Sequence, residues 1–151
     1  MKVILFATES FVDVRDEIEP LMRQHYEEIA LYKERIPLAP DWGRYRHLEQ
    51  TQSLAVYTAR EDGVLIGYSV FLLSYHLHYV HTLVAANDVL FLDRDRRKGS
   101  TGIKLIKYSE QELKKLGVER IMWHVKFDHD FRKILHRLGY TDEEAIVGKL
   151  V

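Results

Sequence analysis

Apolar residues recur with the two-residue period of β-strands through the middle of the chain and near both of its ends. Alternation of this kind, rich in β-branched and aromatic residues, predicts half-buried strands. Asp62-Gly63 separates two such runs and is a strong short-range signal for a hairpin. The run after it is almost continuously apolar, as in a central strand covered on both faces. We expect strands over residues 3–7, 54–60, 64–73, 79–92, 118–125 and 145–151.

The fourth of these strands is expected to break near Asn87 and Asp88, because both residues are rare in strand interiors. Apolar residues from Ile18 to Ile29 follow helical spacing, and Asp13 or Asp16 can cap that helix. A proline in a helix interior removes a hydrogen bond, so the prediction places Pro20 in the first turn.

Three further stretches complete the pattern. Residues 36–43 contain two prolines and a glycine and are predicted to form a loop, followed by at most a short helix over residues 44–50. A helix over residues 103–116 is expected to stop at Gly117, and another, capped by Asp128 or Asp130, at Gly139.

Composition limits the classes of protein to consider. The chain has 151 residues, 46% of them hydrophobic, which suits one domain with one substantial core. Its formal net charge of −1 shows no general basic excess of the kind that nucleic-acid binding requires. Cysteine is absent, which excludes disulfides and thiolate chemistry. No apolar run is long enough to span a membrane, so we expect a soluble, cytoplasmic protein without a membrane partner.

Candidate chemistry concentrates between Asp88 and Gly117, where an apolar strand, a basic glycine-containing turn and an amphipathic helix follow one another. Gly99 and Gly102 allow a ligand to approach the backbone closely. The first turn of the helix leaves N–H groups unpaired and carries positive potential, so anions bind there. Cations and hydroxyl groups add donors suited to a pyrophosphate: Arg94, Arg96, Arg97, Lys98, Ser100 and Thr101. Neither G-x-G-x-x-G nor G-x-x-x-x-G-K-[ST] is present.

This segment resembles the acetyl-CoA-binding motif of the GNAT superfamily of N-acetyltransferases. In that motif a strand ends in V-x-P-x-x-R and continues as [QR]-x-x-G-x-[GA] into a helix that opens with two aliphatic residues. Aligned on Leu105 and Ile106, the chain reads Arg97-Lys98-Gly99-Ser100-Thr101-Gly102, with Ser100 in place of the first glycine and Arg94 in place of the proline. A register one place earlier keeps Gly99 and loses Gly102. Leu138-Gly139-Tyr140 is similar to the family's L-G-[FY] ending.

The resemblance implies a mixed α/β (α+β) fold of about six to seven mostly antiparallel strands and about four helices, splayed between the fourth and fifth strands. It implies acetyl transfer from acetyl-CoA to an amine on a small molecule or a protein. The cofactor-binding residues would be Phe91, Leu92, Arg97, Lys98, Gly99, Ser100, Thr101 and Gly102. The Leu92 N–H would stabilise charge on the thioester oxygen.

Asp88 is the expected general base, since relatives often carry a glutamate at this point of the strand; its alternative reading is a turn or bulge residue. Many relatives have a tyrosine general acid four residues before the glycine of L-G-[FY], where this chain has Leu135. The general-acid role is therefore left unassigned; His129, His136 and Tyr140 are nearby candidates, and His129 is the one included among the expected catalytic residues.

Aromatic residues and histidines are the candidates for the acceptor site: Tyr32 and Trp42 on one wall, with Tyr26 and Tyr45, and His76 and His78 on the other. Core packing is the alternative reading for these aromatic side chains. His76 and His78 share a strand face, but no third ligand at fixed spacing completes a metal site, so none is expected.

Two other readings stay open. A GNAT-fold binding or regulatory protein that retains CoA affinity without catalysis would explain Ser100 and Leu135. A phosphate-backbone binder would use the four cations of the turn, but the interleaved Asp93 and Asp95 oppose it. A homodimer is expected through the exposed edge of the last strand.

Overall fold

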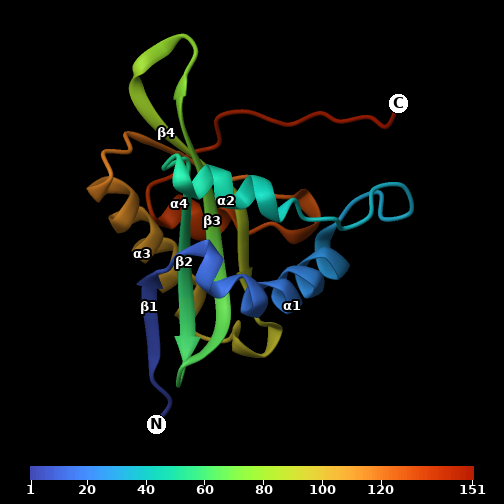
Figure 1. The fold of residues 1–151 in the computed structure, drawn as a ribbon, viewed down its shortest axis with the longest axis vertical. Helices are drawn as coiled ribbons and strands as arrows, with labels where there is room; N and C mark the ends of the chain where they lie inside the picture. The colour runs from blue at the N-terminus through green and yellow to red at the C-terminus, as the bar shows by residue number, and fades with distance from the viewer.

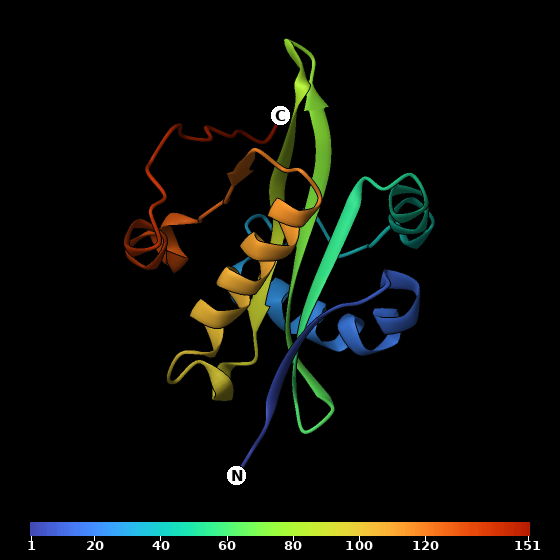
Figure 2. The ribbon, with the colours of Figure 1, turned by 90° about the vertical axis from the view of Figure 1, so that its left-hand side faces the viewer.

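A computed structural model describes residues 1–151 of the protein, which fold around one twisted sheet with helices on both of its faces (Figures 1 and 2). In chain order the elements are β1 (Ile4–Thr8), α1 (Phe11–Ile29), α2 (Trp42–Gln50), β2 (Leu54–Glu61), β3 (Val64–His76), β4 (Tyr79–Leu92), the 3₁₀ turn η1 (Arg94–Arg96), α3 (Thr101–Lys115), β5 (Arg120–Met122), the 3₁₀ turn η2 (Phe127–His129) and α4 (Arg132–Arg137).

The sheet has the order β1-β2-β3-β4-β5. Its first four strands are antiparallel neighbours, and β5 alone runs parallel to β4. The predicted hairpin is confirmed: Asp62 and Gly63 both have positive φ, at 49° and 86°, as the tight turn between β2 and β3 requires. The predicted bounds of β4 are also confirmed.

Two hydrophobic clusters hold the layers together. The first lies between the sheet and the α1–α2 face and includes Phe11, Ile18 and Tyr68. The second lies under α3 on the opposite face and includes Tyr57, Phe71 and Leu105. Figure 2 shows this arrangement, with α1 and α2 on one side of the sheet and α3 on the other. Side chains of β4 alternate between the two clusters.

The expected six to seven strands are wrong, because the sheet has five and the predicted strand over residues 145–151 does not form. The chain after α4 already passes β5 at residues 140–143, where Tyr140 meets Trp123 edge-on and Glu143 pairs with Arg120. Residues beyond this point extend away from the sheet, and Ile146 and Val147 are exposed. The expected homodimer contact was to use the edge of that strand, which does not form. The short β5 forms this edge of the sheet instead.

The start of α1 also differs from the prediction. The helix begins at Phe11 rather than near Asp13 or Asp16, so Pro20 lies in its interior. Its first turn is capped from α2: Glu49 accepts hydrogen bonds from the Phe11 N–H at 2.6 Å and the Ser10 hydroxyl at 2.9 Å. A cap supplied by a distant residue leaves no signal in the local sequence. None of the helices combines the length and apolarity needed to cross a membrane.

Candidate active site

A β-bulge interrupts β4 at the predicted break. Val70 of β3 lies opposite Val89, whereas the next residue, Phe71, lies opposite Asn87, so Asp88 has no partner in β3. The buried Asn87 amide donates to the carbonyl oxygens of Val70 at 3.3 Å and Val89 at 2.9 Å. These two hydrogen bonds fix the bulge, because they satisfy carbonyls that the interrupted ladder leaves free.

The bulge changes the face on which Asp88 lies. Leu90 and Leu92 pack toward α3, and strict alternation would send Asp88 to the same side. The extra residue instead turns its carboxylate toward α2, where Oδ2 lies 3.5 Å from the hydroxyl of Tyr45. Asp88 is thus a bulge residue, as its alternative reading predicted, and its carboxylate faces the hydroxyl of Tyr45.

The surroundings of Asp88 alter its protonation. Burial beside the aromatic side chains raises the pKa of this carboxyl above its usual range. The Tyr45 hydroxyl and the charge of His124 both act in the opposite direction. The carboxylate keeps contact with solvent at the edge of the bulge. A carboxylate with a raised pKa is a better proton acceptor than a free one.

The sheet opens beside the second half of β4. β5 pairs only with Val84–Ala86, so nothing in the sheet pairs with the far edge of β4 from Asn87 onward. The Asp93 N–H donates to Ile66 of β3 at 2.7 Å, and alternation therefore turns the N–H and carbonyl of Leu92 toward the opening. Phe91, which was expected to share this role, directs its backbone to β3 and its buried ring toward α1.

The turn after β4 presents a row of free donors. Gly99 adopts a φ of 93°, which reverses the chain, and α3 begins at Thr101. The N–H groups of Lys98, Gly99 and Ser100 find no acceptor in the protein. Those of Thr101, Gly102 and Ile103 belong to the first helical turn, where no preceding carbonyl is available. A Cβ placed on Gly102 would contact only Leu92 Cδ2, at 3.8 Å, so the surface there is open to a ligand.

Arg97, expected to contact phosphate, is already engaged. Its Nε donates to the Leu92 carbonyl at 2.8 Å, and its Nη2 lies 2.7 Å from Oε2 of Glu28 on α1. The guanidinium also lies 5.5 Å from the centre of the Phe91 ring. Arg96 pairs with Glu61, while Lys98 has no ion pair. Of the predicted cations, Lys98 is the one without a carboxylate partner.

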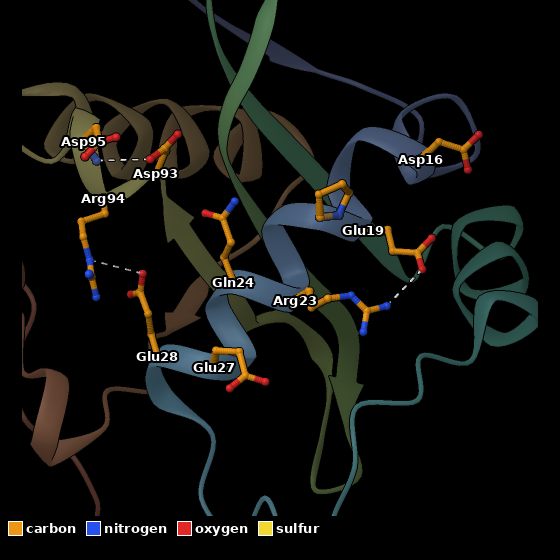
Figure 3. Close-up of a pocket in the computed structure, with 10 residues that line it drawn as sticks. Asp16, Glu19, Arg23, Gln24, Glu27, Glu28, Asp93, Arg94 and Asp95 are labelled. Carbon is orange, nitrogen blue, oxygen red and sulfur yellow. Dashed lines mark hydrogen bonds and ion pairs between the residues drawn. The ribbon is translucent and has the colours of Figure 1, made fainter.

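Two open grooves flank this turn. The larger, of about 790 Å³, lies between α1 and η1, and six carboxylates line it against two arginines (Figure 3). Such a lining repels phosphate, so this groove does not suit the pyrophosphate. The smaller, of about 310 Å³, is lined by Lys98 and Thr101 together with residues of β1 and η1.

His25 of α1 lies at the same opening, beside Phe91 and Arg97. Its ring is 5.3 Å from that of Phe91. Burial lowers its pKa to about 4, and the charges of Lys126, Arg97 and His129 add to this against the opposing effect of Glu28. The imidazole is therefore neutral at pH 7. No local signal distinguishes such a histidine from one packed in a helix face.

The candidates for a general acid make contacts with residues other than Asp88. Leu135 is buried in α4, as its apolar side chain requires. Tyr140 donates to Glu110 at 2.8 Å, and the His136 ring lies 2.8 Å from Asp142. His129 is exposed in η2, close enough to His25 for its charge to lower the pKa of His25.

The predicted acceptor residues do not come together. Trp42 packs against Phe11, with ring centres 5.6 Å apart, and Tyr32 lies exposed in the loop after α1. The rings of His76 and His78 meet edge to face at the tip of the β3–β4 hairpin, which projects from the body in Figure 1. The tip is nine residues of β4 away from Asp88, or about 30 Å. No group of three histidine or carboxylate side chains is arranged to hold a metal ion.

Comparisons with solved structures agree on the fold. The ribosomal-protein-alanine N-acetyltransferase from Brucella melitensis biovar Abortus 2308 is 19% identical, with a TM-score of 0.72 over 99% of this chain and 100% of that chain. An aminoglycoside acetyltransferase from an uncultured soil metagenomic sample is 14% identical, with a TM-score of 0.76 over 99% and 98%. A predicted acetyltransferase from Clostridium acetobutylicum, solved with acetyl-CoA, is 12% identical, with a TM-score of 0.72 over 98% and 96%.

A search among curated protein sequences found no significant match. The sequence model of the acetyltransferase (GNAT) family, in contrast, matches residues 13–140. This span contains the bulge, the open edge of β4 and the donor-rich turn. These are the features that the resemblance of the turn predicted, and family membership supports acyl transfer as the general activity. The chain belongs to the GNAT family of acetyltransferases.

Proposed function

We propose that the protein transfers an acetyl group from acetyl-CoA to an amine, on a small molecule or on a protein. The observation that carries this proposal is the opening beside β4, where an unpaired strand edge leads directly into a helix N-terminus with free donors. A linear thioester joined to a pyrophosphate matches both parts, since its amide-containing arm can pair with a strand edge and its phosphates with N–H groups.

The residues present fit acetyl-CoA. The N–H groups from Lys98 to Ile103 would hold the pyrophosphate, with Lys98 as the nearest unpaired cation. Gly102 leaves the helix surface open to close approach. The Leu92 N–H, directed to the opening, would donate to the thioester oxygen and so stabilise the negative charge that develops there.

Asp88 is the proposed proton acceptor. The amine nitrogen attacks the thioester carbon, a C–N bond forms, the C–S bond breaks, and the amine proton passes to the carboxylate while the thiolate takes one from solvent. Asp88 precedes Leu92 by four residues, about 13 Å along the strand, so the proton would travel along a chain of intervening waters. Holding both reactants in one cleft supplies much of the remaining rate enhancement.

Calorimetric titration with acetyl-CoA tests the binding part of this proposal. Saturable binding is expected, and Gly102→Trp should abolish it by filling the surface beside Leu92. Gly148→Trp is the matched control, because nothing lies near Gly148. Absence of binding to the unaltered protein would overturn the proposal.

Release of free thiol from acetyl-CoA across a panel of amines, polyamines, aminoglycosides and peptide amino termini tests the transfer. We expect at least one acceptor to raise the rate above that without acceptor. If acetyl-CoA binds but no acceptor raises the rate of thiol release, the enzyme proposal gives way to the alternative, a GNAT-fold protein that binds CoA for regulation. Leu135 at the usual position of the acid and the engagement of Arg97 by Glu28 are the observations that favour this alternative.

A further inference from the structure

Tyr45 connects α2 to the bulge. Its ring stacks on Phe11 with centres 4.5 Å apart and 13° between the planes. Because the ring packs on Phe11 and beside Trp42, its hydroxyl is held 3.5 Å from Oδ2 of Asp88. Burial, together with Asp88, raises the pKa of Tyr45 to about 12, so the hydroxyl keeps its proton and acts as a donor.

Tyr68 brings a second hydroxyl to the same region from β3. The residue is 0% exposed, and its hydroxyl oxygen has no hydrogen-bond partner in the protein. Leaving a buried hydroxyl unpaired costs about 1–3 kcal/mol. Tyr45 packs against the hydrophobic cluster that contains Tyr68, and besides burial the groups that raise the pKa of Tyr68 are Tyr45 and Asp88, so the three polar groups lie near one another. Three such groups are sufficient partners for one buried water.

We propose that Tyr45 and Tyr68 are positioning residues for Asp88: Tyr45 donates a hydrogen bond to the carboxylate directly, and Tyr68 donates through one buried water. Their role rests on the proposed function, in which Asp88 accepts the amine proton. The two hydroxyls hold the carboxylate toward the opening and favour its ionised form, which is the form that accepts a proton.

The ionisable groups that face Asp88 come from three elements. Tyr45 lies on α2, Tyr68 on β3 and His124 in the segment after β5, whereas α1 contributes the apolar ring of Phe11. Protonated His124 would also favour the ionised carboxylate. Its contribution is unchanged when either tyrosine is replaced, so the effect of each hydroxyl can be measured alone.

The test follows the ionisation of Asp88 without requiring activity. Carboxyl ¹³C resonances of aspartate-labelled protein are titrated with pH, and the Asp88 resonance is assigned by its loss in Asp88→Asn. Tyr45→Phe keeps the ring that packs on Phe11 and should move the Asp88 midpoint to higher pH. Tyr68→Phe should move it in the same direction by less.

Tyr57→Phe is the matched control. Tyr57 is also buried with an unpaired hydroxyl, but it lies on the opposite face of the sheet near Tyr108. An unchanged midpoint in Tyr45→Phe would overturn the proposal for Tyr45. A midpoint in Tyr68→Phe equal to that in Tyr57→Phe would overturn the water-linked role of Tyr68.

Kinetics then connect the two hydroxyls to the reaction. In an active enzyme the acid limb of the kcat/KM profile should move to higher pH in Tyr45→Phe, with unchanged affinity for acetyl-CoA. If the Asp88 midpoint shifts but the acid limb of the kcat/KM profile does not, the two tyrosine hydroxyls have no catalytic relevance. If the unaltered protein shows no transfer, the proposed function fails, while the titration still decides whether the tyrosines position Asp88.

Discussion

Nη2 of Arg97 lies 2.7 Å from Oε2 of Glu28, so a carboxylate of α1 neutralises the arginine of the donor-rich turn. Glu28 is 15% exposed at its side chain, which makes this pair less screened than a surface ion pair. The same arginine donates a hydrogen bond to the Leu92 carbonyl at the opening of the sheet. Binding of a polyanion at the turn must therefore compete with Glu28 for Arg97.

We expect Glu28→Gln to increase the affinity for CoA several-fold, because Arg97 is then free to meet the phosphates. Titration calorimetry at two salt concentrations measures the effect, which should be larger at low salt. Glu27→Gln, on the neighbouring exposed residue, is the control. Equal affinities in the two variants would show that Arg97 does not contribute to CoA binding.

Asp88→Asn should lower kcat by about 10²–10⁴-fold, the usual contribution of a positioned base. Because the pKa of Asp88 is raised, activity of the unaltered enzyme should decline as the pH falls through that pKa, and the decline should vanish in the variant. Stopped-flow measurement of thiol release against pH checks both. A variant that retains full kcat with unchanged affinity for acetyl-CoA would remove Asp88 from the mechanism.

Asn87→Ala should reduce the free energy of unfolding by about 1–3 kcal/mol, since it removes the donor for two carbonyls at a buried position. Urea denaturation measures the loss. Activity should fall further than stability explains, because Asp88 is presented to Tyr45 only while the bulge persists. Asn87→Asp, which lacks the amide donor and directs a carboxylate at the two carbonyl oxygens, should be at least as destabilising as Asn87→Ala; stability of Asn87→Ala equal to that of the unaltered protein would show that the bulge does not need these bonds.

The low pKa of His25 predicts that the folded protein loses stability in acid. Its folded pKa of about 4 lies below the ordinary value of 6.5, so the unfolded chain binds the proton more tightly. Stability is therefore lost as the pH falls below about 6.5, by up to about 3 kcal/mol once the pH is below 4. His25→Gln should flatten this part of the curve of unfolding free energy against pH. An identical acid dependence in both proteins would place the sensitivity elsewhere.

Much of the fold could be predicted from local pattern. The β2–β3 hairpin depends on Asp62 and Gly63 and on the alternation around them, and these are features of adjacent residues. The donor-rich turn is local for the same reason, since Gly99 and the start of α3 are set within a few residues. The failures have a different origin: Glu49 caps α1 from a distant helix, and the path of the chain past β5 prevents the last strand.

Local pattern predicted the order of the elements up to the last strand, the break in β4 and the glycine-containing turn before α3, because each depends on residues that are neighbours in the chain. The partners that those residues meet depend on the tertiary structure. The bulge turns Asp88 to the face that α2 covers, where the Tyr45 hydroxyl contacts it. Glu28 of α1 forms an ion pair with Arg97. Contacts between elements far apart in sequence depend on how the layers pack. The hydrophobic periodicity of one sequence does not specify that packing.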